Sequence, residues 1–243
     1  MLLKPAINIW EKMNIEDAII WYAAFIFSTV FHEAAHAFTA YKMGDSTAHA
    51  GGQVSLNPLP HIKREPIGTV VVPLLSFALS GWMIGWASAP YNPQWAYDYP
   101  KKAAAMSAAG PLSNLFLILI TAAAIHLLIL SGIFYQPDSI TFSSVVATNT
   151  NLVLNMLAKF LSIMFSLNLI LFVFNLMPFP PLDGSGIAPM YLSEETGRKY
   201  MNFVRNPVFA IAGLFIAWKV FGLIFSQVHL AAINLLYWGS NYQ

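Results

Sequence analysis

Long apolar runs alternate with short polar linkers along this chain. Five runs stand out, at roughly 18–42, 67–88, 103–131, 152–177 and 207–237. A helix that crosses a membrane needs about 20 mostly apolar residues, so every run is long enough to enter a bilayer. The linkers hold most of the prolines and charges. The pattern predicts an all-α polytopic membrane protein with four to five transmembrane helices.

One linker has a different character. Residues 47–56 include the pair Gly51-Gly52, followed by alternating apolar and polar positions. A glycine pair beside such an alternation is typical of a tight turn between two strands. We therefore expect a short β-hairpin-like loop at 47–56.

Composition supports a lipid environment and limits the chemistry. Hydrophobic residues make up 57% of the chain and charged residues 9%, against about 25% charged residues in a soluble domain. The net charge of +1 and the lack of a basic stripe argue against a nucleic-acid partner. Because the chain has no cysteine, any metal must be held by histidine and carboxylate side chains.

The first apolar run contains the motif His32-Glu33-Ala34-Ala35-His36. On a helix, residues four apart share one face, so the two imidazoles can bind one Zn²⁺ while Glu33 acts as a general base on a bound water. Ionisable residues inside a membrane are costly and mark functional sites. The alternative is a polar cluster that only stabilises helix packing.

A catalytic zinc usually takes three protein ligands and one water, so a third ligand is needed. Other histidines are available, at positions 49, 61, 126 and 229. Asp183 is the better candidate, since it follows Pro178, Pro180 and Pro181, which cannot continue a helix. The turn would hold a carboxylate at the membrane edge, with Gly184 allowing a tight bend. The alternative is a solvated aspartate in an ordinary helix-ending loop.

Three motifs together resemble the site-2 proteases, a family of zinc intramembrane metalloproteases. They are His32 to His36, Gly110-Pro111-Leu112-Ser113-Asn114, and Asn175 to Gly184, which has the family's Asn-x-x-Pro-x-Pro-x-Leu-Asp-Gly pattern. Asn57-Pro58-Leu59-Pro60-His61-Ile62 is similar to a segment of the minimal bacterial branch, although Lys63-Arg64-Glu65 departs from that branch. No PDZ or CBS domain is expected.

The resemblance implies one Zn²⁺ per chain, bound by His32, His36 and Asp183, with Glu33 as the catalytic base. It implies a transmembrane-helix protein as substrate and a bacterial plasma membrane as the location. Asn114 and Asn175 are candidates for oxyanion or substrate binding, and hydrogen bonding between helices is the alternative for each. We expect one membrane-embedded domain over 1–243, with a catalytic core at about 18–190 and a C-terminal helix at about 207–237.

The ligand positions constrain the topology. His32 and His36 lie in the second half of the first run, and Asp183 lies just past the fourth. Those two ends must face one side of the membrane, which allows one full crossing between the runs although two apolar runs lie there. The run 67–88 contains Pro73, Gly81 and Gly85, and non-helical backbone is tolerated at depth when it is buried in protein. We therefore predict that 67–88 is re-entrant.

The cationic residues agree with that choice. With 67–88 re-entrant, eight of them share the side of the zinc site and Lys4 and Lys12 face the other. The eight are Lys42, Lys63, Arg64, Lys101, Lys102, Arg198, Lys199 and Arg205. Because cationic loops stay in the cytoplasm, the zinc site is expected near the cytoplasmic face.

The sequence thus predicts an intramembrane zinc metalloprotease that hydrolyses peptide bonds in or near transmembrane segments. Two alternatives remain open. A membrane metal-ion transporter would use the same His and Asp side chains without needing Glu33 as a base. A non-cleaving relative would bind helices only. The oligomeric state is not predicted.

Overall fold

The computed structural model describes residues 14–240 and 242. Helices account for all the named elements in this part of the chain. In chain order they are α1 (Ile15–Lys42), α2 (Thr47–Ala50), α3 (Pro58–Arg64), η2 (Ile67–Val71), α4 (Val72–Ser80), α5 (Pro93–Asp98), α6 (Pro100–Leu130), α7 (Leu152–Asn175), α8 (Asp183–Ile187), η3 (Ala188–Tyr191), α9 (Glu194–Val204) and α10 (Pro207–Leu236).

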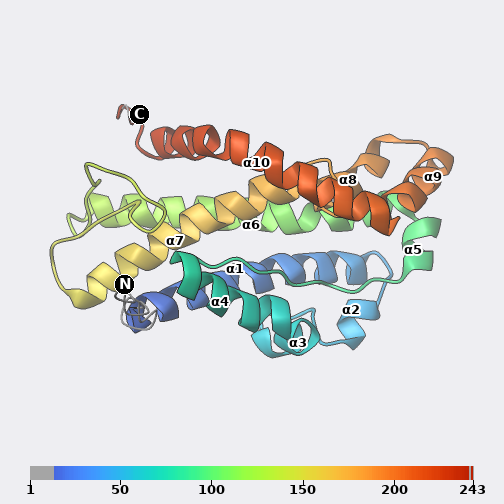
Figure 1. The fold of residues 1–243 in the computed structure, drawn as a ribbon, viewed down its shortest axis with the longest axis horizontal. Coiled ribbons are helices and arrows are strands. Elements are labelled where there is room, and N and C mark those ends of the chain that lie inside the picture. Colours follow the sequence, from blue (N-terminus) through green and yellow to red (C-terminus); the bar gives the residue numbers. More distant parts are fainter. Residues whose placement is uncertain (1–13, 241, 243) are drawn as a thin grey trace, which may run out of the picture.

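Three long helices form the centre of the molecule (Figure 1). Helix α6 packs against both α1 and α7, and α1 also packs against α7. Helices α1 and α7 run in the same direction and α6 runs against them. Within the described residues, these three and α10 are long and apolar enough to cross a membrane. The prediction of an all-α polytopic membrane protein is confirmed.

Side-chain caps fix where the long helices begin. The Asn14 side chain accepts a hydrogen bond from the Glu16 N–H at 2.9 Å, and Asn151 and Asn206 cap α7 and α10 in the same way. Each cap satisfies a backbone donor that the first turn of a helix leaves unpaired. Polar linkers thereby set the boundaries of apolar spans.

The run 67–88 enters the bundle and returns without crossing it. The five residues of η2 and the nine of α4 extend about 21 Å at 1.5 Å per residue, short of the roughly 30 Å of a bilayer core. Gly81 then adopts φ +78°, and the chain runs back in extended form along α1 to α5 (Figure 1). The Trp86 N–H donates to the Gly68 carbonyl at 3.1 Å. This path agrees with the predicted re-entrant segment.

The helical part of the re-entrant segment and its extended return part contact each other at glycines. A Cβ at Gly68 would overlap the Trp86 carbonyl, and one at Gly85 would overlap the Gly68 carbonyl and crowd the Phe25 ring of α1. Backbone can approach this closely only where no side chain stands. These glycines therefore allow the fold-back and its packing on α1.

The expected β-hairpin-like loop at 47–56 is wrong. Thr47–Ala50 is a turn of helix, and the glycine pair ends it: Gly52 adopts φ +75°, and the Gln53 N–H bonds back to the Ala48 carbonyl at 3.0 Å. Glycine in a left-handed conformation closes helices as readily as hairpins, which explains the misinterpretation. In the part of the chain that is described, β-pairing is limited to two isolated bridges, in the loop after α6.

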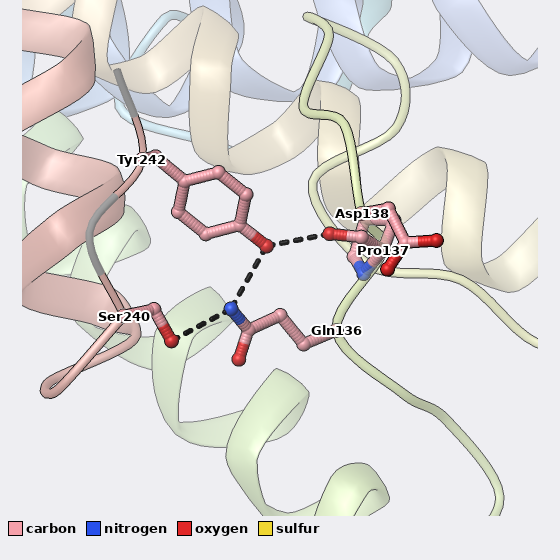
Figure 2. A pocket seen from close by; sticks show the side chains of 5 residues that line it. All are labelled: Gln136, Pro137, Asp138, Ser240 and Tyr242. Atoms are coloured by element: carbon pink, nitrogen blue, oxygen red, sulfur yellow. Dashed lines mark hydrogen bonds between the residues drawn. The ribbon is translucent and has the colours of Figure 1, made fainter.

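That loop, residues 131–151, is fastened to the end of α10. The Gln136 Nε2 donates to the Ser240 hydroxyl and to the Tyr242 hydroxyl, each at 2.8 Å (Figure 2). The Tyr237 hydroxyl donates to the Val145 carbonyl, also at 2.8 Å. The loop contains no Lys or Arg. Lys4 and Lys12, predicted on the same side, lie outside the described residues.

Helix α10 lies at the edge of the bundle. Only 17% of the residues in its most apolar 18-residue stretch are buried in the protein. Near its start, Gly213 packs so closely on the Pro180 carbonyl that a Cβ would overlap it. Ala217 is buried in a cluster with Met177 and Leu182. The start of α10 is thus held against the turn that precedes α8.

Candidate metal centre

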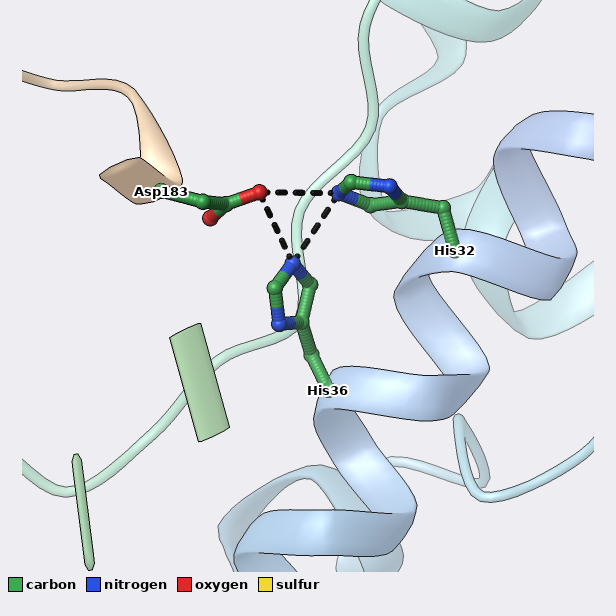
Figure 3. Close-up of side chains that lie close together, drawn as sticks. All are labelled: His32, His36 and Asp183. Carbon is green, nitrogen blue, oxygen red and sulfur yellow. Dashed lines mark hydrogen bonds and ion pairs between the residues drawn. The ribbon is translucent and has the colours of Figure 1, made fainter. Parts of the chain in front are cut away.

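Three side chains converge between α1 and α8 (Figure 3). His32 and His36 project from one face of α1, and their Nε2 atoms lie 3.0 Å apart. Asp183 is the first residue of α8, and its Oδ2 lies 3.1 Å from the Nε2 of His32 and 3.3 Å from that of His36. The ligand atoms of these three side chains lie close enough together to share one metal ion, and no other group of His and acidic side chains in the described residues does so.

The turn before α8 is shaped to bring the aspartate inward. A Cβ at Gly184 would overlap the carbonyls of Leu176 and Met177, so the chain packs on itself where only glycine fits. The Ser185 hydroxyl donates to the Leu182 carbonyl at 2.7 Å, and the Tyr200 hydroxyl donates to the Ser185 carbonyl at 2.9 Å. Helix α9 thereby anchors the start of α8.

The charge state of Asp183 suits a metal ligand. Burial by itself raises the pKa of this carboxyl, but when the imidazoles are protonated, the charge of His36 and hydrogen bonds from both histidines outweigh burial and hold the pKa below its usual range. Burial also raises the pKa of Tyr200, which keeps its hydroxyl a donor. The carboxylate is therefore ionised at neutral pH.

Helix α6 orients both imidazoles. The Nδ1 of His36 contacts the Met106 carbonyl at 2.7 Å, and the Nδ1 of His32 contacts the Asn114 Oδ1 at 2.6 Å. A carbonyl oxygen can only accept, so each Nδ1 carries a proton, and in the neutral rings each Nε2 presents its lone pair to Asp183. The sequence motif on α1 predicted that the two histidines share one face, but not the partner atoms on α6.

The floor of the site is Gly110. A Cβ there would overlap the Nε2 of His36 and stand 2.5 Å from that of His32, against the two nitrogens that face Asp183. The next residue, Pro111, lies inside α6 and has no backbone N–H to donate. Gly110-Pro111 was part of the sequence resemblance, and the structure shows that the glycine keeps the site open.

The donor set fits a zinc ion. Two neutral imidazole nitrogens and a carboxylate oxygen face one another, and three lone pairs at such distances need a positive species between them. Ligands at 2.0–2.1 Å from a tetrahedral zinc stand about 3.3 Å apart, close to the separations of 3.0, 3.1 and 3.3 Å found here. Nitrogen and carboxylate donors are ordinary zinc ligands.

Glu33 lies beside the ligands on α1. It is buried, with 7% of its surface exposed, and follows His32 by about 100° of helical rotation. Among the described residues it has no hydrogen-bond or ion-pair partner. Its carboxylate oxygens are not among the fully enclosed polar atoms that lack a partner, as a group that must meet a water molecule requires, and an ionisable residue in an apolar helix is a candidate functional residue.

The two predicted amides occupy different positions. Asn114 is fully buried, and its Nδ2 donates to the Asn168 Oδ1 at 2.8 Å, so both ends of its amide already have partners. Asn175 is the last residue of α7, is partly exposed and lies nearer the turn that carries Asp183. It follows Asn168 by seven residues, which places both on the same face of α7.

The remaining histidines lie apart from the metal centre. His49 stacks on Tyr41, and His61 is buried with its Nε2 3.1 Å from the Ser55 carbonyl. His126 packs near Tyr237, and His229 stacks on Phe142. None of the four belongs to the group that could share a metal ion in the described part of the chain.

Comparison with known proteins gives consistent matches. Residues 20–220 match the profile of Peptidase family M50. "Putative zinc metalloprotease YwhC" of Bacillus subtilis is 38% identical over 161 residues, which cover 65% of this chain and 63% of that protein. "Putative zinc metalloprotease Rip2" of Mycolicibacterium smegmatis is 32% identical over 180 residues, covering 74% of this chain and 60% of that protein. The protein of the same name from Mycobacterium tuberculosis H37Rv is 29% identical over 207 residues, 85% of this chain and 70% of its own length. No solved structure matches the chain.

Proposed function

The chain belongs to peptidase family M50, the site-2 protease family, and from that membership we propose that it is an intramembrane zinc endopeptidase. The matched region spans about three fifths of the first two relatives, 63% and 60% of their length, so the activity of a whole relative is not transferred directly. The observation that carries the proposal is the convergence of His32, His36 and Asp183 next to the unpartnered Glu33.

His32, His36 and Asp183 would hold one Zn²⁺ per chain. A zinc ion held there supplies Lewis acidity, which lowers the pKa of a water molecule and polarises a peptide carbonyl. The protein's part is orientation: the Met106 carbonyl and the Asn114 amide fix the two imidazoles, and the ionised Asp183 supplies the negative charge. Three protein ligands leave a fourth position open for chemistry.

Glu33 is the proposed general base. Its carboxylate accepts a proton from the attacking water and returns that proton to the nitrogen of the leaving amine. This role needs a carboxylate beside the ligands but not among them, which agrees with its place on α1. Glu33 is not part of the metal-binding group.

An amide donor near the scissile carbonyl would stabilise the developing oxyanion. Of the two candidates, Asn175 is better suited, because it is partly exposed and has no side-chain partner among the described residues. Asn114 is fully buried and already bonded at both ends. We therefore propose Asn175 for oxyanion or substrate binding.

The proposed substrate is a transmembrane helix of another membrane protein. A helix hides its carbonyls in its own hydrogen bonds, so cleavage requires local unwinding at the site. The extended return segment, residues 82–92, runs beside α1, the helix that carries His32 and His36 (Figure 1). An extended backbone of this kind can pair with an unwound strand, which makes it the proposed place for the substrate.

We propose that the site opens toward the cytoplasm of a bacterium. Helix α9 and the start of α6, which carry most of the described cationic residues of the linkers, lie at the end of the bundle beside α5, whereas α3, with Lys63 and Arg64, lies nearer the middle (Figure 1). The loop at the opposite end, residues 131–151, has no Lys or Arg. Retention of Lys and Arg in the cytoplasm supports this orientation. The bilayer itself is the protein's solvent, as the four apolar helices require.

The test separates a protease from a transporter or a non-cleaving relative. Glu33→Gln keeps the shape of the side chain and removes the base. The variant should retain zinc while cleavage falls by about 10²-fold or more. Purified wild-type and variant proteins would be incubated in liposomes with a panel of single-span membrane proteins, with and without a zinc chelator, and metal content measured in parallel.

Undiminished cleavage by Glu33→Gln would refute the mechanism. A change in metal affinity, with no cleavage by the wild type, would favour transport. Cleavage that survives complete removal of zinc would refute the metal site.

A further inference from the structure

A chain of buried side chains leads from the metal centre into α7. Asn114 lies between His32 and Asn168, and the Asn168 Nδ2 donates to the Ser28 hydroxyl at 2.9 Å and to the Met164 carbonyl at 2.8 Å. Ser28, Asn114 and Asn168 are all fully buried. Asn168 and Ser28 belong to none of the motifs that predicted the site.

The direction of every bond in this chain is determined by its far end. The Met164 carbonyl can only accept, so the atom of Asn168 that faces it must be the amide nitrogen. The Asn168 oxygen then faces Asn114 and must receive an N–H from it. That leaves the Asn114 oxygen toward His32, which must donate from Nδ1.

We infer that Asn168 is a positioning residue for the metal site, acting through Asn114 to hold His32 in the tautomer whose Nε2 faces the metal with its lone pair. The inference rests on the proposed role of His32 as a ligand. If Asn114 turned its amide over, its N–H would point at Nδ1, and the proton would move to Nε2, where it blocks coordination.

The geometry makes such a residue useful in this place. Ser28 lies four residues before His32, one turn away on the same face of α1. The chain from His32 through Asn114 and Asn168 therefore closes on α1 again and ties α1, α6 and α7 together. Partners of metal-binding histidines typically contribute 10–100-fold to metal affinity.

The experiment measures zinc affinity by competition with a chelator in purified, metal-stripped protein. Asn168→Leu should weaken zinc binding by about 10-fold or more, although it touches no ligand. Asn114→Leu should do at least as much. Asn114→Asp supplies a carboxylate that accepts from His32 Nδ1 with either oxygen, but its second oxygen would face the Asn168 Oδ1, which cannot donate to it. This single variant should therefore bind zinc more weakly than the wild type.

The decisive variant is the pair Asn114→Asp with Asn168→Leu. It should bind zinc at least as well as Asn114→Asp alone, since removal of the Asn168 oxygen relieves its contact with the carboxylate, which needs no orientation by Asn168. A matched control is Ser162→Ala, which removes a fully buried side chain of α7 that bonds to Ala158, Val145 and Val146 rather than to the metal site. This control should leave zinc affinity unchanged.

The outcomes are distinguishable. Wild-type zinc affinity in folded Asn168→Leu would overturn the inference and leave the metal site intact. If Asn168→Leu weakened zinc binding equally in the wild-type and Asn114→Asp backgrounds, the inference would also fall, because the effect would then be one of packing. Wild-type protein that binds no zinc in the same assay would overturn the metal site and this inference with it.

Discussion

Asp183 presents one oxygen, Oδ2, to both imidazoles at 3.1 and 3.3 Å. Its ionised state is supported by the histidines themselves, which hold the pKa of the carboxyl below its usual range. Removal of this side chain leaves two ligands, too few for a catalytic zinc site. The site would also lose the negative charge of the carboxylate, which attracts a divalent cation.

Asp183→Ala should therefore lose most of the bound zinc, whereas His61→Ala should keep it. His61 is a fair control, because it is a fully buried histidine outside the metal-binding group. Metal analysis of the purified variants tests this expectation. Zinc content that followed His61 rather than Asp183 would contradict the assignment.

The residues of the proposed site differ in how visible they are in the sequence. His32, Glu33 and His36 are visible because a helix converts a short spacing into one face. Asp183 is visible because the prolines before it must end α7. Asn168 and the Met106 carbonyl are not visible, since their function depends on which atoms of different helices meet, and no spacing along the chain encodes that.

Among the elements, the re-entrant segment, residues 67–88, determines the topology. Its helical part is too short to cross a bilayer, and the contact between Gly68 and Trp86 returns the chain to the side from which it entered. As a result α6 is the one full crossing between α1 and α7 in the described chain, which puts the ends of both on one side.

Cysteines introduced singly in place of Lys63 and Gln94, both exposed, should be labelled from the same side of the membrane by an impermeant thiol reagent. Ser139→Cys, in the exposed loop after α6, should be labelled from the opposite side. The cysteine-free background makes each signal specific. Labelling of positions 63 and 94 from opposite sides would mean that the segment crosses the membrane.

Element boundaries were largely predictable and local irregular structure was not. The five apolar runs correspond within a few residues to the four long helices and to the helical part of the re-entrant segment. Hydrophobicity determines such runs because the bilayer accepts only satisfied backbone. The glycine pair at 51–52 was misread, since the same left-handed conformation serves both a hairpin and a helix end, and the choice depends on neighbours such as Ala48.

At the scale of the whole molecule, the metal site joins distant parts of the chain. His36 and Asp183 lie on α1 and α8, and α8 is anchored in turn by α9 and packs on α6. A ligand that binds only the folded state stabilises it by about 2.7 kcal/mol at a concentration of 100 times its dissociation constant. Zinc should thus act as a structural link as well as a reagent.

Chelation should lower the melting temperature of the purified protein, and added zinc should restore it. Asp183→Ala should melt near the chelated wild type and respond little to zinc, because the bridge between α1 and α8 is gone. Thermal unfolding in detergent would measure both. An equal zinc-dependent rise in wild type and variant would show that the metal binds elsewhere.

Helix α10 is the least buried of the four candidate membrane-spanning helices in the described residues. Its 30 residues span about 45 Å, well beyond the roughly 30 Å hydrocarbon core of an average bilayer. It packs on α7 through Trp218 and Phe221 against Phe174 and through His229 beside Ser166, and near its start Gly213 packs on the Pro180 carbonyl. A helix that is longer than the hydrophobic thickness around it tilts, and Pro180 lies three residues before Asp183. The tilt of α10 is therefore mechanically connected, through the contact of Gly213 with Pro180, to the turn that carries the Asp183 carboxylate.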